Sequence, residues 1–65
     1  MATEALRHAT RAIELDPDNV TARVVQVKGY YIAAEKAKAK AALNQALVRF
    51  PGNAELLEVK KALAL

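Results

Sequence analysis

Side chains that could carry out chemistry are few in this chain of 65 residues. It has no cysteine and no serine, and His8 is its single histidine. Without cysteine there is no disulfide and no thiolate metal site, and one histidine does not make a metal site alone. Two pairs of acidic residues remain, Asp16 with Asp18 and Glu55 with Glu58.

Paired carboxylates can serve as general acid and general base. Asp16 and Asp18 flank Pro17, however, and are explained more simply as turn and capping residues. Glu55 and Glu58 stand three positions apart, which places them on one solvated helix face in a chain too short to form a pocket around them. We therefore predict that the chain is not an enzyme and that it binds no cofactor and no metal.

Basic residues raise the question of a nucleic-acid partner. His8, between Arg7 and Arg11, could meet a phosphate, but a surface histidine explains it as well. Tyr30 and Tyr31 could stack on bases, although Tyr30 is also suited to a core. The net charge of +3 is mild.

The lysines of the third predicted helix give no continuous basic surface. Lys36 and Lys40 share a helix face, whereas Lys38 points about 200° away from Lys36. The sequence therefore argues against nucleic acid as the partner.

Helix-forming residues dominate the chain, and the apolar residues recur at helical spacing. We predict a single all-α domain with four antiparallel helices. They span residues 3–15, 20–33, 37–49 and 54–64. Thr3, Asn19 and Asn53 are expected to be N-caps, and Pro17 and Pro51 to follow helix ends.

The third helix should be the centre of the core, with Leu43 and Leu47 buried. The second helix is apolar on two sides, and both sides should be buried. One side consists of Val20, Val24, Val27 and Tyr31, and the other of Val25, Gly29 and Ile32. The fourth helix should bury Leu56, Leu57, Val59 and Leu63.

Matching residues recur at a fixed offset along the chain: Ala5 and Ala39, Ala12 and Ala46, Ile13 and Leu47, Pro17 and Pro51, Asn19 and Asn53. With this period the chain resembles the tetratricopeptide repeat, a helix-turn-helix unit of about 34 residues. Residues 20–53 form one complete unit, flanked by two half units, so the resemblance covers the whole chain.

The second-helix signature of the family is well kept, in Ala39, Leu43, Ala46, Leu47 and Pro51. The first-helix signature is degenerate. Tyr30 matches the usual aromatic residue, but Arg23, Gln26 and Val27 stand where Trp, Leu and a small residue are common, and Ala34 replaces the usual Gly.

The resemblance implies an α-solenoid fragment whose concave face binds a protein partner. By register, that face is lined by Thr21, Val24, Lys28, Tyr31, Glu55, Glu58, Ala62 and Leu65. A clamp for a peptide carboxylate is not expected, since Lys28 is the only cation there and Val25 and Val59 replace its polar donors. The surface suits an amphipathic helix or an extended peptide with apolar and basic side chains. Val24 and Tyr31 could instead pack on a neighbouring helix.

A structural self-association unit, a homodimer, is the alternative function. Repeat arrays bury their apolar faces on neighbours, and this chain has one full repeat and two halves. Two copies could dock through the second and fourth helices. Alternatively, Ala34 could stay helical and avoid a left-handed conformation that costs about 1–2 kcal/mol. One helix from Val20 to Phe50, roughly 46 Å long, would then give a domain-swapped dimer.

No apolar run approaches the roughly 20 residues that a membrane span needs. The first residues carry Glu4 and no apolar core, so we expect no signal peptide. Together with the absence of cysteine, this favours the cytoplasm, and nothing else in the sequence indicates a compartment.

Overall fold

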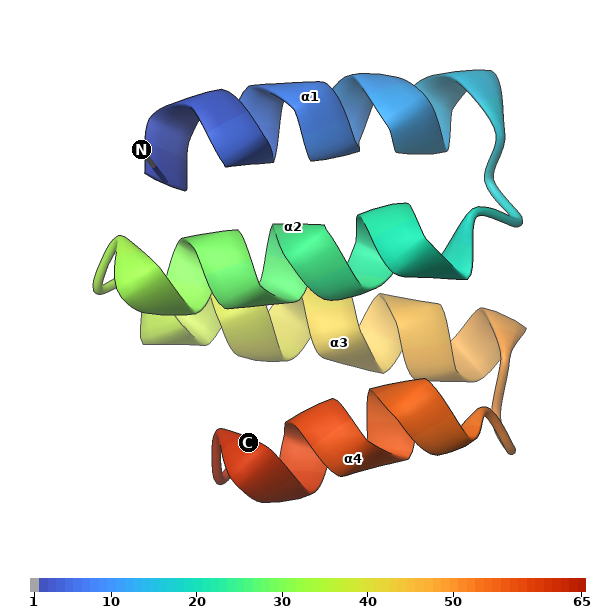
Figure 1. Ribbon diagram of the computed structural model, residues 1–65. Coiled ribbons are helices and arrows are strands. Elements are labelled where there is room, and N and C mark those ends of the chain that lie inside the picture. Colours follow the sequence, from blue (N-terminus) through green and yellow to red (C-terminus); the bar gives the residue numbers. More distant parts are fainter. Residues whose placement is uncertain (1) are drawn as a thin grey trace.

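The computed structural model describes residues 2–65, which form four α-helices and no strand (Figure 1). The helices are α1 (Ala2–Leu15), α2 (Val20–Ile32), α3 (Lys36–Arg49) and α4 (Ala54–Ala62). Consecutive helices run in opposite directions, and α3 lies behind α2 in the view of Figure 1. α1 packs on α2, α2 packs on α3, and α4 contacts both α3 and α2. The prediction of an all-helical chain with four helices is confirmed for the described residues.

Several helix boundaries differ by one or two residues from those predicted. α1 begins at Ala2, so Thr3 lies inside its first turn and is not the residue that precedes the helix. α2 ends at Ile32 and α3 begins at Lys36, one residue earlier than expected in each case. α4 ends at Ala62 because Ala64, expected to be helical, has a φ of 55°.

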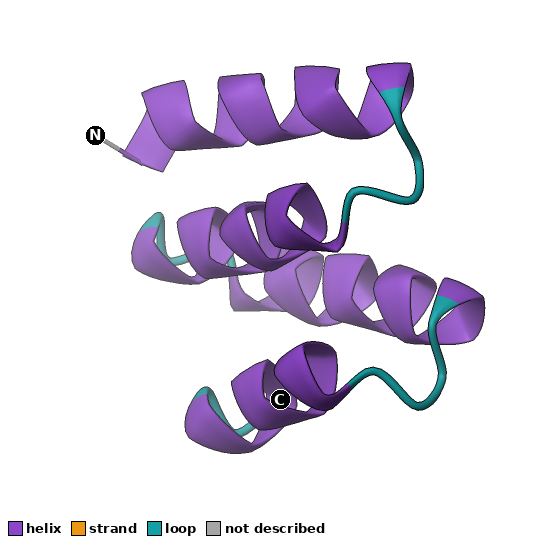
Figure 2. Cartoon of the chain, turned by 45° about the vertical axis from the view of Figure 1, so that its right-hand side comes forward, coloured by secondary structure: helices purple, strands orange, loops and turns teal. Residues whose placement is uncertain are grey.

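The two longer loops lie at the same end of the molecule and are built alike (Figure 2). Asn19 Oδ1 accepts a hydrogen bond from the Ala22 N–H at 3.0 Å, and Asn53 Oδ1 accepts one from the Leu56 N–H at 3.1 Å. Both asparagines are therefore N-caps, as predicted. Two backbone bonds are also common to both loops: Asp16 N–H to Ala12 C=O and Phe50 N–H to Ala46 C=O, both 2.8 Å, and Asn19 N–H to Asp16 C=O and Asn53 N–H to Phe50 C=O, at 3.0 and 3.1 Å.

The turn between α2 and α3 is made without glycine. Ala34 takes the left-handed conformation, with a φ of 63°. The Glu35 N–H donates to the Tyr30 carbonyl at 2.9 Å and the Ala34 N–H to the Tyr31 carbonyl at 3.1 Å, the pair of bonds that defines a Schellman motif. α2 and α3 therefore form a hairpin, and the continuous helix that would have swapped between copies is not formed.

The core is shared by α2, α3 and α4. Its buried residues are Val24, Val27, Ala39, Ala42, Leu43, Ala46, Leu56 and Val59. Leu43 is fully buried, which confirms its central place, whereas Leu47 is only partly buried. Leu57 was expected in the core and is instead exposed. Among the residues whose burial is described, α1 buries Ala9 alone.

α1 covers the second apolar side of α2 incompletely. Ala9 of α1 and Ala22 and Gly29 of α2 are buried, and such small residues let two helices approach closely. Val25 and Ile32 were expected to be buried on this side, but their exposed fractions are 37% and 74%. This apolar surface stays exposed because, within residues 2–65, no third helix packs against both α1 and α2. In the core, by contrast, three helices pack together, α2, α3 and α4.

Candidate partner-binding cleft

A cleft of about 280 Å³ lies between α2 and α4 and opens to solvent. Five of the residues predicted for the partner-binding surface line it, namely Val24, Lys28, Glu55, Glu58 and Ala62, together with Val59 and Leu63. Val24 and Val59 are each 5% exposed and belong to the core, so they form the floor of the cleft. The other interpretation of Val24, a residue packed on neighbouring helices, therefore describes it better than direct partner contact does.

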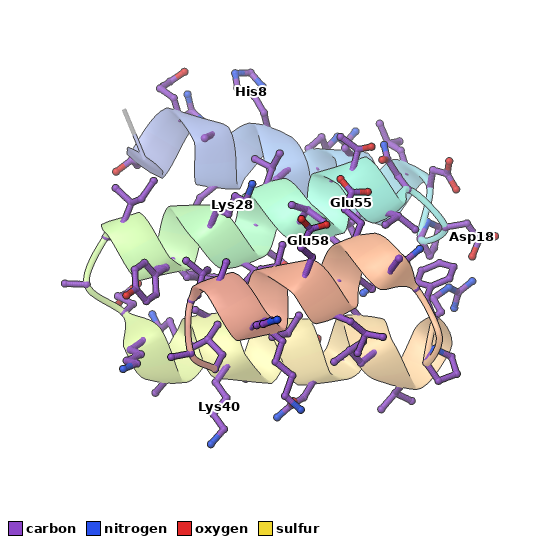
Figure 3. The ribbon with its side chains drawn as sticks, turned by 60° about the horizontal axis from the view of Figure 1, so that its bottom comes forward. His8, Asp18, Lys28, Lys40, Glu55 and Glu58 are labelled. Atoms are coloured by element: carbon purple, nitrogen blue, oxygen red, sulfur yellow. The ribbon has the colours of Figure 1, made fainter. Side chains whose placement is uncertain are left out.

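The rim of the cleft is charged, and Figure 3 shows its three ionic side chains. Lys28 projects from α2, while Glu55 and Glu58 project from α4 on the side toward α2. All three residues are exposed, and the expectation that so short a chain forms no pocket around Glu55 and Glu58 is wrong, since both line this cleft. None of them forms an ion pair within residues 2–65. The rim thus offers two negative charges and one positive charge to a bound molecule.

The remaining predicted residues do not line this cleft. Thr21 is exposed and lies at a different groove, between α1 and α2. Tyr31 is exposed near the end of α2, and Leu65 is partly buried against the core. Of the eight predicted residues, Val24 and Lys28 of α2 and Glu55, Glu58 and Ala62 of α4 therefore meet at this cleft, whereas Thr21, Tyr31 and Leu65 do not line it.

Val59 and Leu63 line the cleft although they were expected to serve only the core. Both are apolar residues on the inner side of α4, and Leu63 is the residue at which this helix stops. The short length of α4 leaves Leu63 at the edge of the core, where it is partly buried. The pattern of apolar residues identified them correctly as inward-facing. It could not show that a cleft would open above them.

The other clusters considered from the sequence are paired at the surface. His8 Nε2 lies 3.6 Å from Glu4 Oε2, and Arg7 and Arg11 pair with Glu4 at 3.0 Å and with Glu14 at 3.5 Å. These three basic side chains thus each have a carboxylate neighbour, which leaves no concentrated positive charge for a phosphate. Asp16 Oδ1 accepts from the Asp18 N–H at 3.1 Å, which is the turn role predicted for it.

The lysines of α3 lie apart from the cleft. Lys38 pairs with Glu35 at 3.2 Å, and Lys36 and Lys40 are exposed. Figure 3 shows Lys40 projecting from α3 away from Lys28, Glu55 and Glu58. The described residues contain no group of three or more potential metal ligands. Over the same residues, no helix has the length and apolar character needed to cross a bilayer.

Comparison of the chain with protein-family models, with curated proteins and with solved structures finds no match in any of the three. The cleft has therefore to be interpreted from its own chemistry. It has an apolar floor, charges without an ion-pair partner on its rim, and no cysteine, serine or histidine among the residues that line it. Such a surface can bind and orient another chain.

Proposed function

We propose that the protein is an interaction module that binds an amphipathic helix or an extended peptide in the cleft between α2 and α4. The observation that carries the proposal is the combination of an apolar floor with rim charges that have no ion-pair partner in residues 2–65. Apolar side chains of a partner would cover Val59 and Leu63, and its basic side chains would face Glu55 and Glu58. Burial supplies most of such a binding energy, while exposed charges govern orientation and association rate.

The repeated loops support a relation to the tetratricopeptide repeat. Asn19 and Asn53 make the same capping bonds in successive loops, and the separation of the two residues matches the length of that repeat. In the proposed arrangement α2 and α4 are the first helices of successive units, which form the binding face of such arrays. The degenerate first-helix signature, with Arg23 and Gln26 in place of Trp and Leu, distinguishes the chain from typical units.

Selection from a displayed random peptide library tests the proposal. Selected peptides should combine aliphatic residues with Lys or Arg, and their binding should shift the amide resonances of Lys28, Glu55, Glu58 and Ala62. Removing both rim carboxylates with Glu55→Gln and Glu58→Gln should weaken binding about 2- to 30-fold, since each exposed ion pair contributes roughly 0.2–1 kcal/mol. Added salt should weaken binding to the unmodified protein in the same direction.

A matched double variant controls for the change in net charge. Glu4→Gln with Glu14→Gln also removes two exposed carboxylates, both on α1 and outside this cleft. It should leave peptide affinity unchanged. The proposal fails if the two double variants behave alike, if the shifted resonances lie elsewhere, or if no library peptide binds below millimolar concentration.

Self-association through α2 and α4 is a second candidate. It is favoured by the apolar side chains that these helices leave exposed, Tyr31 on α2 and Leu57 on α4. If two copies dock there, light scattering at high micromolar concentration should give a dimer mass, and Leu57→Lys should reduce it to that of a monomer. Val48→Lys is the control, because Val48 is an even more exposed apolar residue but lies on α3. A monomer mass for the unmodified protein rejects this candidate.

A further inference from the structure

A second groove runs between α1 and α2, separate from the cleft of the proposed function. It measures about 330 Å³ and is lined mainly by small and apolar residues, among them Ala5, Ala9, Ala12, Ala22 and Val25. Ile32 stands two helical turns after Val25 on the same side of α2. These two side chains are 37% and 74% exposed, so the apolar surface extends along α2 beyond the groove.

Most residues that line this groove have a counterpart in the core, which stands later in the sequence by the same number of positions as Asn53 stands after Asn19. Six of its lining residues are Ala5, His8, Ala9, Ala12, Ala22 and Val25. The residues at the same offset from these six are Ala39, Ala42, Leu43, Ala46, Leu56 and Val59. All six of these later residues are buried in the core cluster. One surface is thus open and its counterpart is closed, although both are built from a pair of helices joined by the same kind of loop.

The surface in the core is closed because another helix, α2, packs against it. The core cluster consists of those six wall residues and two more, Val24 and Val27, both from α2. Val20 and Tyr30 of α2 pack at its edge. The chain itself therefore shows what closes this type of surface: a helix with apolar side chains at positions i, i+4, i+7 and i+10. Among residues 2–65, no helix occupies the corresponding place against α1 and α2.

We infer that the groove between α1 and α2 is a docking site for an amphipathic helix of a partner protein, seated there as α2 is seated between α3 and α4. This is an interaction surface beyond that of the proposed function, and it does not depend on it. Burial of exposed Val25 and Ile32 under such a helix would provide the driving force.

The walls of the groove also indicate the size of the partner's side chains. Where the core has Leu43 and Leu56, the groove has Ala9 and Ala22, and each replacement removes an isopropyl group from the wall. Part of that space is taken up by the packing of α1 on α2, since both alanines are themselves buried. The remaining opening of about 330 Å³ favours leucine over valine at the partner's two central positions.

A second copy of the chain does not supply this helix through α4. At the same offset, the α2 residues Val24 and Val27 correspond to Glu58 and Lys61 of α4. Both are exposed, and docking α4 of another copy in the groove would place their charges against an apolar wall. We therefore do not expect the groove between α1 and α2 of one copy to bind α4 of another copy.

Peptides derived from α2 test the inference. The probe is a peptide of residues 18–35 carrying Val24→Leu and Val27→Leu, titrated into the intact protein and followed by amide resonances. It should bind saturably, with shifts at Ala5, Ala12 and Val25. The unmodified peptide should bind more weakly. The control peptide, with Val24→Glu and Val27→Lys as in α4, should bind at least about tenfold more weakly than the leucine peptide, because it buries charge in place of two apolar side chains.

Variants of the protein separate the two grooves. Val25→Lys should abolish binding of the leucine peptide, and the milder Val25→Thr should weaken it, with circular dichroism confirming that both variants remain folded. Glu55→Gln with Glu58→Gln should leave this binding unchanged, so failure here is distinguishable from failure of the proposed function.

Four results would overturn the inference. They are no saturable binding of the leucine peptide up to 1 mM, equal affinity for the control peptide, shifts at Leu43 and Leu56 that show α2 being displaced from its own site, and a peptide-free dimer that Val25→Lys dissociates. The last result would assign the groove to a second copy.

Discussion

The molecule has two halves, α1 with α2 and α3 with α4. Their loops are built alike, but the helices of the two halves differ in what surrounds them. Each half has a helix that ends before a proline, a four-residue loop, and an asparagine that caps the next helix. In the second half, Leu43 and Leu56 are fully buried under α2. In the first half, the equivalent Ala9 and Ala22 are also buried, but the groove that they line stays open.

This contrast separates local from tertiary causes. The loops agree because their hydrogen bonds are made by residues within a few positions of one another, so the same sequence signals give the same geometry. The packing differs because burial needs a third helix, and within residues 2–65 only the second half has one against its apolar wall. A repeat in sequence therefore predicts a repeat of loops more reliably than a repeat of buried surface.

The sharpest test of the difference is the pair of equivalent positions Leu43 and Ala9. Leu43→Ala should lower the free energy of unfolding by about 2–5 kcal/mol, because it leaves a cavity at a fully buried site. A domain of this size has roughly 3–10 kcal/mol in total, so much of the variant should be unfolded at room temperature. Thermal and urea unfolding followed by circular dichroism measure this.

The matching change in the first half should cost far less. Ala9→Gly removes one methyl group and lowers helix propensity, at a cost of about 1 kcal/mol. Comparable losses at the two positions would mean that α1 is bound into the core as firmly as α3, which would contradict the comparison between the halves.

The capping residues test the other side of the comparison, the likeness of the loops. Asn19→Ala and Asn53→Ala should each lower the free energy of unfolding by about 1 kcal/mol, since each removes a side-chain acceptor from a helix N-terminus. The two losses should agree within about 0.5 kcal/mol in chemical denaturation. The substitution Asn19→Asp or Asn53→Asp keeps the acceptor and should restore most of the stability. A large loss at one site alone would show that the loops are alike in geometry but not in energy.

The sequence predicted those features that depend on neighbouring residues. The loops around Pro17 and Pro51 and the caps Asn19 and Asn53 could be placed because each of these residues has a specific backbone role. The burial of Leu43 could be predicted because it lies on the apolar stripe of a helix flanked by two others. Thr3 was wrong as a cap because helix formers continue past it to Ala2.

The features that could not be predicted depend on distant segments. The turn at Ala34 left two folds open, because nothing local marks an alanine for the left-handed region. Val24 belongs to the floor of the cleft because α3 and α4 both pack against its side of α2, which helical spacing alone does not reveal. The prediction that Leu57 is buried was wrong for the same reason. The face of α4 that Leu57 occupies has no neighbouring helix within residues 2–65 to cover it.

The turn that joins the two halves gives the third test. Ala34→Gly should raise the free energy of unfolding by about 0.5–1 kcal/mol. It relieves a left-handed alanine that costs roughly 1–2 kcal/mol, offset in part by the larger entropy of glycine in the unfolded chain. Ala33→Gly is the matched control one residue earlier. Ala33 has an ordinary φ of −77°, so the same substitution should destabilise by about 0.4–1 kcal/mol.

If Ala34→Gly stabilises the protein and Ala33→Gly destabilises it, then only Ala34 has the left-handed conformation. If both substitutions destabilise, the helix continues through Ala34, and α2 and α3 are joined in solution. Thermal unfolding resolves the difference, since about 1 kcal/mol shifts the midpoint by roughly 4–8 °C in a domain of this size.

The smallest effect concerns an ion pair that links the loop of the first half to the second half. Arg49, at the end of α3, places Nη2 2.7 Å and Nε 2.8 Å from Asp18 Oδ1. At the repeat offset Asp18 corresponds to Gly52 and Arg49 to Leu15, so this contact cannot recur in the other loop. It is therefore a feature in which the otherwise similar loops differ.

Both side chains are largely in solvent, so screening limits what this contact contributes. Their exposed fractions are 67% for Asp18 and 47% for Arg49, and exposed pairs of this kind contribute about 0–1 kcal/mol. Asp18→Asn should lower the free energy of unfolding by no more than about 1 kcal/mol at low salt, and by less in 1 M NaCl, where charges are screened beyond roughly 3 Å. Glu58→Gln removes a carboxylate that has no ion pair in residues 2–65 and should change stability little. A loss at Asp18 that persists in high salt would show that the geometry of the two guanidinium contacts itself holds the first loop against α3. The two halves would then be coupled through their loops as well as through α2.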